Sequence, residues 1–335
     1  MDLNELKSRV IERADEFLEK PEEGRIHPLP FIAREEAAWL ASYPDLDALC
    51  DAADEIARHF NGSEIDSCSI VNARSGMCGE DCKWCAQATR HHTGCATYNF
   101  LDTDEVMEAA RHNEREGIRR YSLVTSGRKV NDKDLEHFCN IYEKLSRETG
   151  LYLCASMGLL DADQMKRLAE SGVKRYHCNM ETSEKVFPTL CSTHTSDDKK
   201  ATIRAARAAG LDVCSGGIIG MGETMDDRLD FAFELAELDV DSVPMNILNP
   251  IKGTPLENTP LIGEEDIIRT AATWRFILPT QSIRFAGGRM RLCHETMLRL
   301  LKGGDNGVLM GDMLTTVSND IASDRKLFAE AGFRF

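Results

Sequence analysis

The sequence has no apolar segment long enough to cross a membrane and no surplus of positive charge. Hydrophobic residues make up 42% of its 335 residues, but no run approaches the ~20 apolar residues that a membrane helix needs. The charged residues are 40 Lys+Arg and 56 Asp+Glu, which give a formal net charge of -16. Such a surface would repel a polyanion. The sequence therefore argues against a membrane protein and against a nucleic-acid-binding protein.

An export signal is also missing from the first residues. Residues 1–20 alternate acidic, basic and aliphatic side chains at helical spacing, with no basic segment followed by an apolar one. We therefore expect a cytoplasmic protein whose 12 cysteines remain reduced. Clustered cysteines in that compartment more often bind metal or take part in chemistry than form disulfides. No Ser/His/Asp arrangement and no pair of carboxylates indicates general acid–base catalysis.

Short β-branched runs alternate with helical periodicity from Ile65 onward. The runs that predict strands are Ile65–Asn72, Arg119–Ser126, Leu151–Met157, Lys174–Met180, Leu211–Ile219, Asp241–Leu248, Gln281–Ala286 and Gly307–Leu314. The helices predicted between and after them are Asp104–Glu116, Asp132–Glu148, Asp161–Ser171, Asp197–Ala209, Asp227–Leu238, Glu264–Leu278 and Arg291–Lys302. This alternation predicts an α/β protein with a (β/α)8 TIM-type barrel, whose active site lies at the carboxyl ends of the strands.

Two amphipathic helical patterns, Asn4–Lys20 and Ala33–Phe60, precede the first predicted strand. We interpret residues 1–62 as an N-terminal helical extension. Residues 63–335 then form the barrel with a C-terminal helix, because no Pro-rich or Ser-rich linker divides them.

A cysteine triplet follows the first predicted strand, in the sequence Cys78-Gly-Glu-Asp-Cys82-Lys-Trp-Cys85. Three thiolates at this C-x3-C-x2-C spacing can hold three irons of a [4Fe–4S] cluster and leave the fourth iron open to another ligand. A zinc knot or an electron-transfer cluster is the alternative, and either normally recruits a fourth Cys or His. The position of the triplet beside the expected active site favours the open cluster.

Together with later motifs, the triplet resembles the biotin synthase family of radical S-adenosylmethionine (SAM) enzymes. The matching motifs are Cys214-Ser-Gly-Gly-Ile-Ile-Gly-Met-Gly-Glu223-Thr, Ser242-Val-Pro-Met-Asn246, Lys252-Gly-Thr-Pro-Leu256, Ile283-Arg284-Phe-Ala-Gly-Gly-Arg289 and Leu314-Thr-Thr316. Their order and spacing are similar to those of the family from about Ser69 to Thr316. This spread makes the resemblance more specific than the triplet alone.

The resemblance implies an enzyme that cleaves SAM reductively to a 5′-deoxyadenosyl radical. That radical abstracts hydrogen from two unactivated carbons of dethiobiotin, and sulfur from an auxiliary iron–sulfur cluster closes the ring of biotin. The missing acid–base residues agree with chemistry carried by cofactors. By the same analogy we expect a homodimer and an electron donor such as flavodoxin or ferredoxin.

Two cysteines, Cys154 and Cys214, fall within predicted strands, where alternation directs each side chain either to the lumen or to the helix layer. The resemblance implies that both face the lumen as auxiliary-cluster ligands, together with Arg284. Ser122 occupies the place of another cysteine ligand of the family, and Cys191 has no counterpart in the usual enzymes. We hypothesise a [4Fe–4S] rather than a [2Fe–2S] auxiliary cluster held by Cys154, Cys191 and Cys214. The candidates for its fourth ligand are Ser122, Arg284, Cys178 and exogenous sulfide.

Three further cysteines have weaker indications. Cys178 alternates opposite to His177, Asn179 and Glu181. The resemblance places Asn179 and Glu181 in the lumen, so we expect the Cys178 side chain to point outward unless the strand bulges. Cys68 and Cys95 flank the triplet loop, and the sequence indicates no role for either.

The ligand pockets are also implied by the resemblance. For SAM it implies Trp84, Asn179, Glu181, Lys199, Gly217 and Ile218. For dethiobiotin it implies Asn179 and Asn246 at the ureido ring and Thr315 and Thr316 at the carboxylate tail. Glycines allow a close approach of backbone to ligand. Glu181 stands where the family usually has aspartate, and Lys199 could instead be a solvated residue at a helix start.

Two other readings remain open at the level of sequence. One is a radical SAM paralogue of the hydrogenase-maturase type, which would use the same barrel on another substrate. The other class comprises an iron–sulfur carrier, an electron-transfer protein or a zinc-stabilised binding barrel. A carrier would contain iron and sulfide without cleaving SAM, and a zinc protein would be colourless.

Overall fold

The computed structural model describes residues 1–311 and 321–335, so the predicted substrate residues Thr315 and Thr316 lie outside the described residues. In the described part the strands are β1 (Asp66–Arg74), β2 (Arg120–Thr125), β3 (Tyr152–Ser156), β4 (Arg175–His177), β5 (Asp212–Cys214), β6 (Gly217–Ile219), β7 (Ser242–Ile247), β8 (Ser282–Phe285) and β9 (Gly307–Met310). All of their pairings are parallel.

These strands close into a barrel. Their order in the sheet is β5-β4-β3-β2-β1-β9-β8-β7-β6, and β5 also pairs with β7. Because β5 and β6 are consecutive and both pair with β7, they share one position, and the barrel is eight-stranded. The predicted (β/α)8 fold is confirmed.

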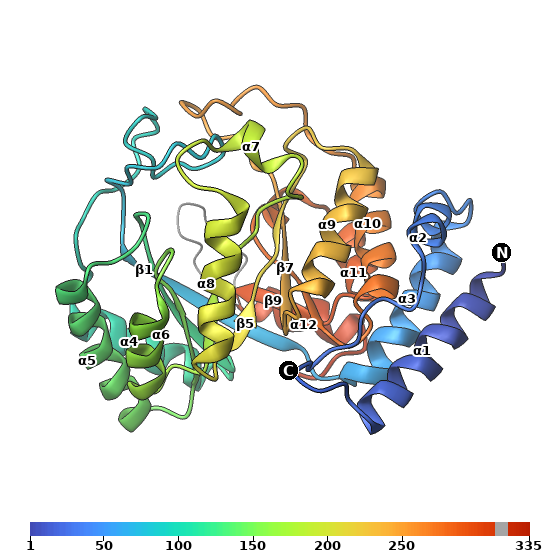
Figure 1. The fold of residues 1–335 in the computed structure, drawn as a ribbon, viewed down its shortest axis with the longest axis horizontal. Coiled ribbons are helices and arrows are strands. Elements are labelled where there is room, and N and C mark those ends of the chain that lie inside the picture. The colour runs from blue at the N-terminus through green and yellow to red at the C-terminus, as the bar shows by residue number, and fades with distance from the viewer. Residues whose placement is uncertain (312–320) are drawn as a thin grey trace.

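The helices surround this barrel (Figure 1). They are α1 (Leu3–Glu19), α2 (Arg34–Ala41), α3 (Leu46–Asn61), α4 (Thr103–Arg115), α5 (Asp132–Glu148), α6 (Ala162–Glu170), α7 (Phe187–Leu190), α8 (Ser196–Ala208), α9 (Met225–Glu237), α10 (Glu264–Ile277), α11 (His294–Leu301) and α12 (Ile321–Glu330). In the described part of the chain, no helix is long and apolar enough to span a membrane.

Two predicted elements, one helix and one strand, are each interrupted in the structure. The predicted helix Ala33–Phe60 is broken between α2 and α3, because Pro44 lacks an N–H and Asp45 begins a new helix. The Asp45 carboxylate accepts a hydrogen bond from the backbone N–H of Ala48 at 3.0 Å. The predicted strand Leu211–Ile219 is interrupted at residues 215–216, where a Cβ on Gly216 would lie 2.1 Å from the Pro244 carbonyl oxygen.

Further differences concern the segments around α7 and α11. The helix predicted over Arg291–Lys302 begins only at His294, and a 3₁₀ turn (Arg289–Arg291) precedes it. The short helix α7, which the sequence did not indicate, lies in the loop after β4. It carries Cys191 at its end and so positions part of the candidate site.

The first three helices pack outside the barrel. Helix α3 contacts α10 and α1, and α2 contacts α9 and α10. Figure 1 shows them on the side of α10 and α11, opposite α4 and α5. Arg34 forms an ion pair with Asp230 of α9 at 2.6 Å, and Arg269 of α10 donates to the Tyr43 carbonyl at 2.7 Å.

The two faces of the strands differ in polarity, and this difference positions the site. Outward side chains such as Tyr121, Leu153, Val213 and Phe285 are buried in one apolar core with the helices. The inward side chains of the same strands include cysteines, arginines and serines that surround a cavity. The lumen is therefore suited to bind a polar ligand or a metal cofactor, and the apolar side chains of the described residues do not fill it.

Candidate active site

A cavity of about 380 Å³ occupies the barrel lumen and opens at the carboxyl ends of the strands. The predicted site residues that line it are Cys78, Cys82, Trp84, Cys85, Ser122, Cys154, Asn179, Glu181, Lys199, Cys214, Asn246 and Arg284. Cys191, Gly217 and Ile218 are not among its lining residues. The structure thus brings the triplet and two of the three predicted auxiliary cysteines to one cavity.

The triplet loop is fixed by its own backbone. The N–H of Cys78 donates to the Gln87 carbonyl at 3.1 Å, and the N–H of Cys85 donates to the Cys82 carbonyl at 3.0 Å. Burial raises the pKa of the Cys85 thiol to about 11, a shift that the backbone N–H groups of Gln87 and Ala88 partly oppose. A bound iron would offset that penalty, since a coordinating thiol is deprotonated by the metal. The three thiols at one cavity mouth therefore fit a cluster with an open iron.

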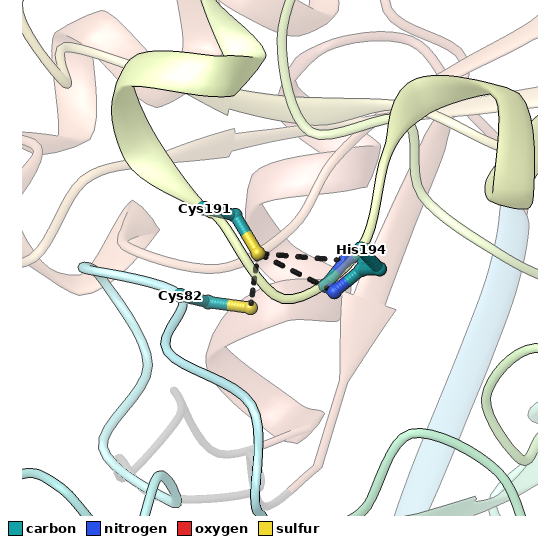
Figure 2. A group of neighbouring side chains, drawn as sticks. All are labelled: Cys82, Cys191 and His194. Atoms are coloured by element: carbon teal, nitrogen blue, oxygen red, sulfur yellow. Dashed lines mark hydrogen bonds between the residues drawn. The ribbon is translucent and has the colours of Figure 1, made fainter.

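Cys191 lies beside Cys82 of this triplet (Figure 2). Its sulfur is 3.7 Å from the sulfur of Cys82 and 3.3 Å from Nδ1 of His194. The loop after α7 docks on the triplet loop through Asp81, whose Oδ1 accepts the backbone N–H of Ser192 at 2.9 Å. Cys191 thus lies outside the lining of the cavity that Cys154 and Cys214 share. The physical reason is that α7 carries Cys191 to the cavity mouth, whereas strands carry the other two into the lumen.

The register of the strands defines layers of side chains in the lumen. In a parallel barrel of this type, each layer takes four side chains from alternate strands. Cys68 of β1 pairs with Arg120 of β2, and two residues further along β2, Ser122 pairs with Cys154 of β3. Cys154 is therefore two residues further along the register than Cys68, two strands away. This is the offset between side chains of one layer, so Cys68 and Cys154 lie in the same layer.

The same offset of two residues for every two strands continues round the barrel and leads back to Cys68. The successive pairs are Cys154 with Arg175, His177 with Cys214, Cys214 with Ser242, Pro244 with Arg284, Arg284 with Gly307, and Leu309 with Cys68. One layer thus holds Cys68, Cys154, Cys214 and Arg284. We call it the thiol layer. The layer nearer the cavity mouth holds Ser122, His177, Pro244 and Leu309, and the layer on the opposite side holds Arg120, Arg175, Ser242 and Gly307.

Positive charge surrounds the thiol layer. Asp66 lies below it and accepts hydrogen bonds from Arg284 Nη2 and Arg120 Nε, each at 2.6 Å. Burial acts to raise the pKa of Asp66, but Arg284, Arg120 and Arg175 bring it below its usual range. Arg175 donates to Asp212 at 3.3 Å, and its Nε and Nη1 are buried with no hydrogen-bond partner in the described part of the chain. Three guanidinium groups face two carboxylates, Asp66 and Asp212, so this part of the cavity keeps one excess positive charge that suits an anionic group.

The thiols of this layer respond differently to their surroundings. Burial acts to raise the pKa of Cys214, but His177, Arg284 and Arg175 lower it to about 6. The Nδ1 atom of His177 lies 3.3 Å from the Cys214 sulfur. Burial raises the pKa of Cys68 to about 11 and also raises the pKa of Cys154. Cys214 is thus the thiol that most readily ionises before any metal binds.

Cys178 departs from the expected outward orientation and lines the cavity together with His177. Regular strand geometry ends at His177, so strict alternation no longer applies to the residues that follow it. The backbone N–H of Cys178 donates to the Cys214 carbonyl at 3.0 Å.

The predicted SAM and substrate residues form a connected network near the cavity mouth. Asn179 Oδ1 accepts from the N–H of Gly216 at 3.0 Å, and Lys199 Nζ donates to the Asn179 carbonyl at 2.8 Å. Lys199 is 7% exposed, so it is not a solvated helix-start residue. Asn246 joins two strand ends, donating to the Gly217 carbonyl at 3.0 Å and accepting from the Gly287 N–H at 2.8 Å.

Glu181 has a backbone conformation that is unusual for a residue with a side chain, with φ of 77°. Its carbonyl accepts a hydrogen bond from the N–H of Ile218 at 2.8 Å, and its Oε2 lies 3.4 Å from Nδ2 of Asn179. Burial raises the pKa of its carboxyl group, and Lys199 and His177 oppose that rise. Such local strain persists where the surrounding structure holds it, often at a binding site.

Gly217 provides the first test of this network. A Cβ at this position would lie 2.2 Å from the Glu181 carbonyl oxygen and 2.8 Å from Cε1 of Phe231. Gly217→Ala should therefore push Glu181 away from β6 and weaken SAM binding about tenfold, or about 1.4 kcal/mol. Titration of the reconstituted protein with SAM measures this change.

The matched control is Gly263→Ala, because the nearest atom to its added Cβ is Asp266 Oδ2 at 3.8 Å. Equal SAM affinity in the two variants would show that the approach of Gly217 to Glu181 does not shape the SAM site.

Comparisons with known proteins agree with this geometry. The Radical SAM superfamily matches residues 74–235, and the Biotin and Thiamin Synthesis associated domain matches residues 244–334. The solved structure of methylornithine synthase shares the fold, with a TM-score of 0.81 over 98% of this chain and 96% of that one at 19% identity. The hydrogenase maturase HydG shares it with a TM-score of 0.77 over 98% of this chain and 75% of that one, at 15% identity. Fold and site together define a radical SAM enzyme.

Curated relatives identify the family within this class. The biotin synthase of Heliobacterium modesticaldum is 49% identical over 303 residues, which cover 90% of this chain and 93% of the relative. The biotin synthase of Clostridium botulinum strain Langeland is 48% identical over 289 residues, covering 86% and 91%. That of Porphyromonas gingivalis is 47% identical over 300 residues, covering 90% and 91%. This chain belongs to the biotin synthase family.

Proposed function

We propose that this protein converts dethiobiotin to biotin by radical SAM chemistry, with sulfur supplied by an auxiliary iron–sulfur cluster in the thiol layer. The observation that carries the proposal is one cavity with the cysteine triplet at its mouth and thiols in the lumen beneath it. The names of relatives that match about nine-tenths of the chain support the substrate. A carrier protein would have no need of this second, deeper set of thiols.

The chain's own residues would prepare the reaction. A [4Fe–4S] cluster with an open iron binds SAM and supplies the electron that cleaves it, so Cys78, Cys82 and Cys85 are proposed to hold three irons. Trp84 and Ile218 pack around a small apolar cluster with Leu190, Met221 and Leu248. We propose that this cluster forms the apolar wall beside SAM.

Polar groups at the strand ends would orient both ligands. Asn179, Glu181 and Lys199 are proposed to bind the polar groups of SAM, close to Gly217, whose backbone Glu181 contacts. Asn179 and Asn246 are proposed to face the ureido ring of dethiobiotin. The barrel wall excludes bulk water, which protects a reactive radical from side reactions. Dethiobiotin would then lie between the triplet and the thiol layer, with its reacting carbons exposed to both.

The auxiliary cluster is proposed to be [4Fe–4S] rather than [2Fe–2S]. Support comes from the change in the ligand set, because a serine stands at position 122 and a further thiol, Cys68, shares the layer of Cys154 and Cys214. A small redox protein such as a flavodoxin or ferredoxin is the proposed electron donor, and a homodimer is the proposed assembly. A basic docking face on that donor would suit the net charge of -16.

Anaerobic incubation of the reconstituted protein with SAM, a strong reductant and dethiobiotin tests the proposed function. Mass spectrometry should detect both 5′-deoxyadenosine and biotin. Formation of 5′-deoxyadenosine with no biotin or thiolated intermediate would contradict the proposed substrate and favour a paralogue. Formation of neither product by protein with a full iron load would favour an iron–sulfur carrier.

A further inference from the structure

We propose that Cys68 is the third thiolate ligand of the auxiliary cluster, so that Cys68, Cys154 and Cys214 hold it with Arg284 completing the ring. This inference rests on the proposed function, which requires an auxiliary cluster in the lumen. The register places these four residues in one layer, on alternate strands, and each lines the cavity. A cluster centred on the barrel axis would therefore meet one ligand from each side.

Cys68 faces the lumen because of its strand position. Along β1, Asp66 bonds to Arg120 and Arg284 within the barrel, and Ile70 lines the cavity, so Cys68 between them shares their face. The intervening Ser67 points outward and accepts the backbone N–H of Arg119 at 3.1 Å. The charge of a Cys68 thiolate would interact with those of both Cys154 and Cys214.

Two of the other candidate ligands, Ser122 and Cys191, are placed less well. Ser122 belongs to the layer nearer the mouth, and a hydroxyl is a harder ligand than the thiolates that iron–sulfur clusters use. Cys191 does not line the cavity and lies 3.7 Å from the Cys82 sulfur. β2 thus carries Ser122 in place of the cysteine usual in the family, and the proposed ligand Cys68 lies on the neighbouring strand β1, one layer deeper.

The spacing of the thiols fits several irons better than a single ion. Among residues 1–311 and 321–335, only one group of three His, Cys, Asp or Glu side chains has its possible metal-binding atoms within 4.8 Å of one another. It consists of Cys82, Cys191 and His194. The thiols of the thiol layer are therefore spread more widely. A multi-iron cluster separates its cysteine sulfurs because each binds a different iron, whereas one tetrahedral ion draws them together.

Arg175 supplies an independent indication of an anionic occupant. It is 6% exposed, and its Nε and Nη1 have no hydrogen-bond partner among residues 1–311 and 321–335, although its Nη2 pairs with Asp212. A buried donor without a partner costs free energy, so native structures seldom retain one. We infer that these two N–H groups donate to sulfides of the cluster. Arg120 and Arg284 share Asp66, and Arg175 pairs with Asp212, so the three guanidinium groups leave one positive charge to offset part of the charge of the thiolates.

Iron binding separates this assignment from its alternatives. In a parent variant with Cys78, Cys82 and Cys85 all replaced by Ala, any iron bound after anaerobic reconstitution reports the auxiliary site alone. Adding Cys68→Ala should remove more than half of that iron. Cys95→Ala and Cys191→Ala should each leave the iron content unchanged. Mössbauer spectra of the same samples give the cluster type.

Three outcomes distinguish failure of this inference from failure of the proposed function. Unchanged iron in Cys68→Ala, with loss in Cys191→Ala, would overturn the assignment and restore the grouping inferred from sequence. Unchanged iron in both would leave Cys68 without a ligand role. A parent variant that binds no iron at all would contradict the auxiliary cluster itself and hence the proposed function.

Two further variants protect the test against misfolding. Cys68→Ser preserves the size of the side chain and should bind less iron than the parent, with an unchanged circular dichroism spectrum. Arg175→Lys preserves the charge but removes the two unpartnered N–H groups. It should lower the reduction potential of the auxiliary cluster, because hydrogen bonds to cluster sulfurs help to set that potential. An unchanged potential would contradict the role given to Arg175.

Discussion

Replacing Arg289 with Met is expected to lower the free energy of unfolding by about 3–5 kcal/mol. Its Nη1 and Nη2 donate to Oδ1 and Oδ2 of Asp324 at 2.7 and 2.6 Å, and both side chains are fully buried. Removing one partner leaves an uncompensated buried carboxylate, which is far more costly than loss of the pair. The pair connects the turn after β8 to α12, so its loss should also detach the C-terminal helix from the barrel.

Urea unfolding of the cofactor-free protein measures this effect. Arg299→Met is the matched control, because Arg299 forms an ion pair with Asp47 whose side chain is 79% exposed. That control should change the stability by less than about 1 kcal/mol. A double variant with Arg289→Met and Asp324→Leu should recover much of the loss, since an apolar pair can replace a buried ion pair. An effect of Arg289→Met no larger than the control would contradict this account.

Replacing Cys85 with Ala is expected to reduce SAM cleavage to the level of protein that lacks its cluster. The remaining thiols, Cys78 and Cys82, would hold two corners of the cluster, and the backbone N–H groups that face the Cys85 sulfur would lose their acceptor. A Cys85→Ala protein should therefore form no 5′-deoxyadenosine above background, while it retains the iron of the thiol layer.

The matched control for this variant is Cys139→Ala. The Cys139 thiol lies on α5, half-buried, and its sulfur is 3.8 Å from the Arg167 carbonyl oxygen. This variant should form 5′-deoxyadenosine at the rate of the unmodified protein. Undiminished SAM cleavage by Cys85→Ala would contradict the role proposed for the triplet.

Most of the barrel could be predicted because its signals are local. β-branched runs mark the strands, and a capping residue such as Asp161 marks a helix start, where its side chain accepts a hydrogen bond from the backbone N–H of Gln164. The interruption between β5 and β6 could not be predicted, because it occurs where the backbone of Gly216 comes close to Pro244. That proximity exists only once the barrel has closed.

The candidate site divides in the same way. The triplet is contiguous in sequence, so its spacing, together with its position after the first predicted strand, indicated an open iron–sulfur cluster. Cys68 could not be recognised, because its place beside Cys154 depends on the register of several strands at once. The position of Cys191 beside Cys82 could not be predicted for a related reason, since α7 and the contact of the following loop with Asp81 decide where that thiol lies. A local sequence pattern cannot predict which residues are brought together by the pairing of strands that are distant in the sequence.

The most direct test of the central claim follows the sulfur atom itself. The auxiliary cluster is reconstituted with sulfide of a heavy sulfur isotope, free sulfide is removed, and dethiobiotin is turned over once in unlabelled buffer. Mass spectrometry should find biotin that carries the heavy isotope in the unmodified protein and no labelled biotin in Cys68→Ala. Biotin with sulfur of natural isotopic composition would contradict a cluster in the thiol layer as the sulfur donor.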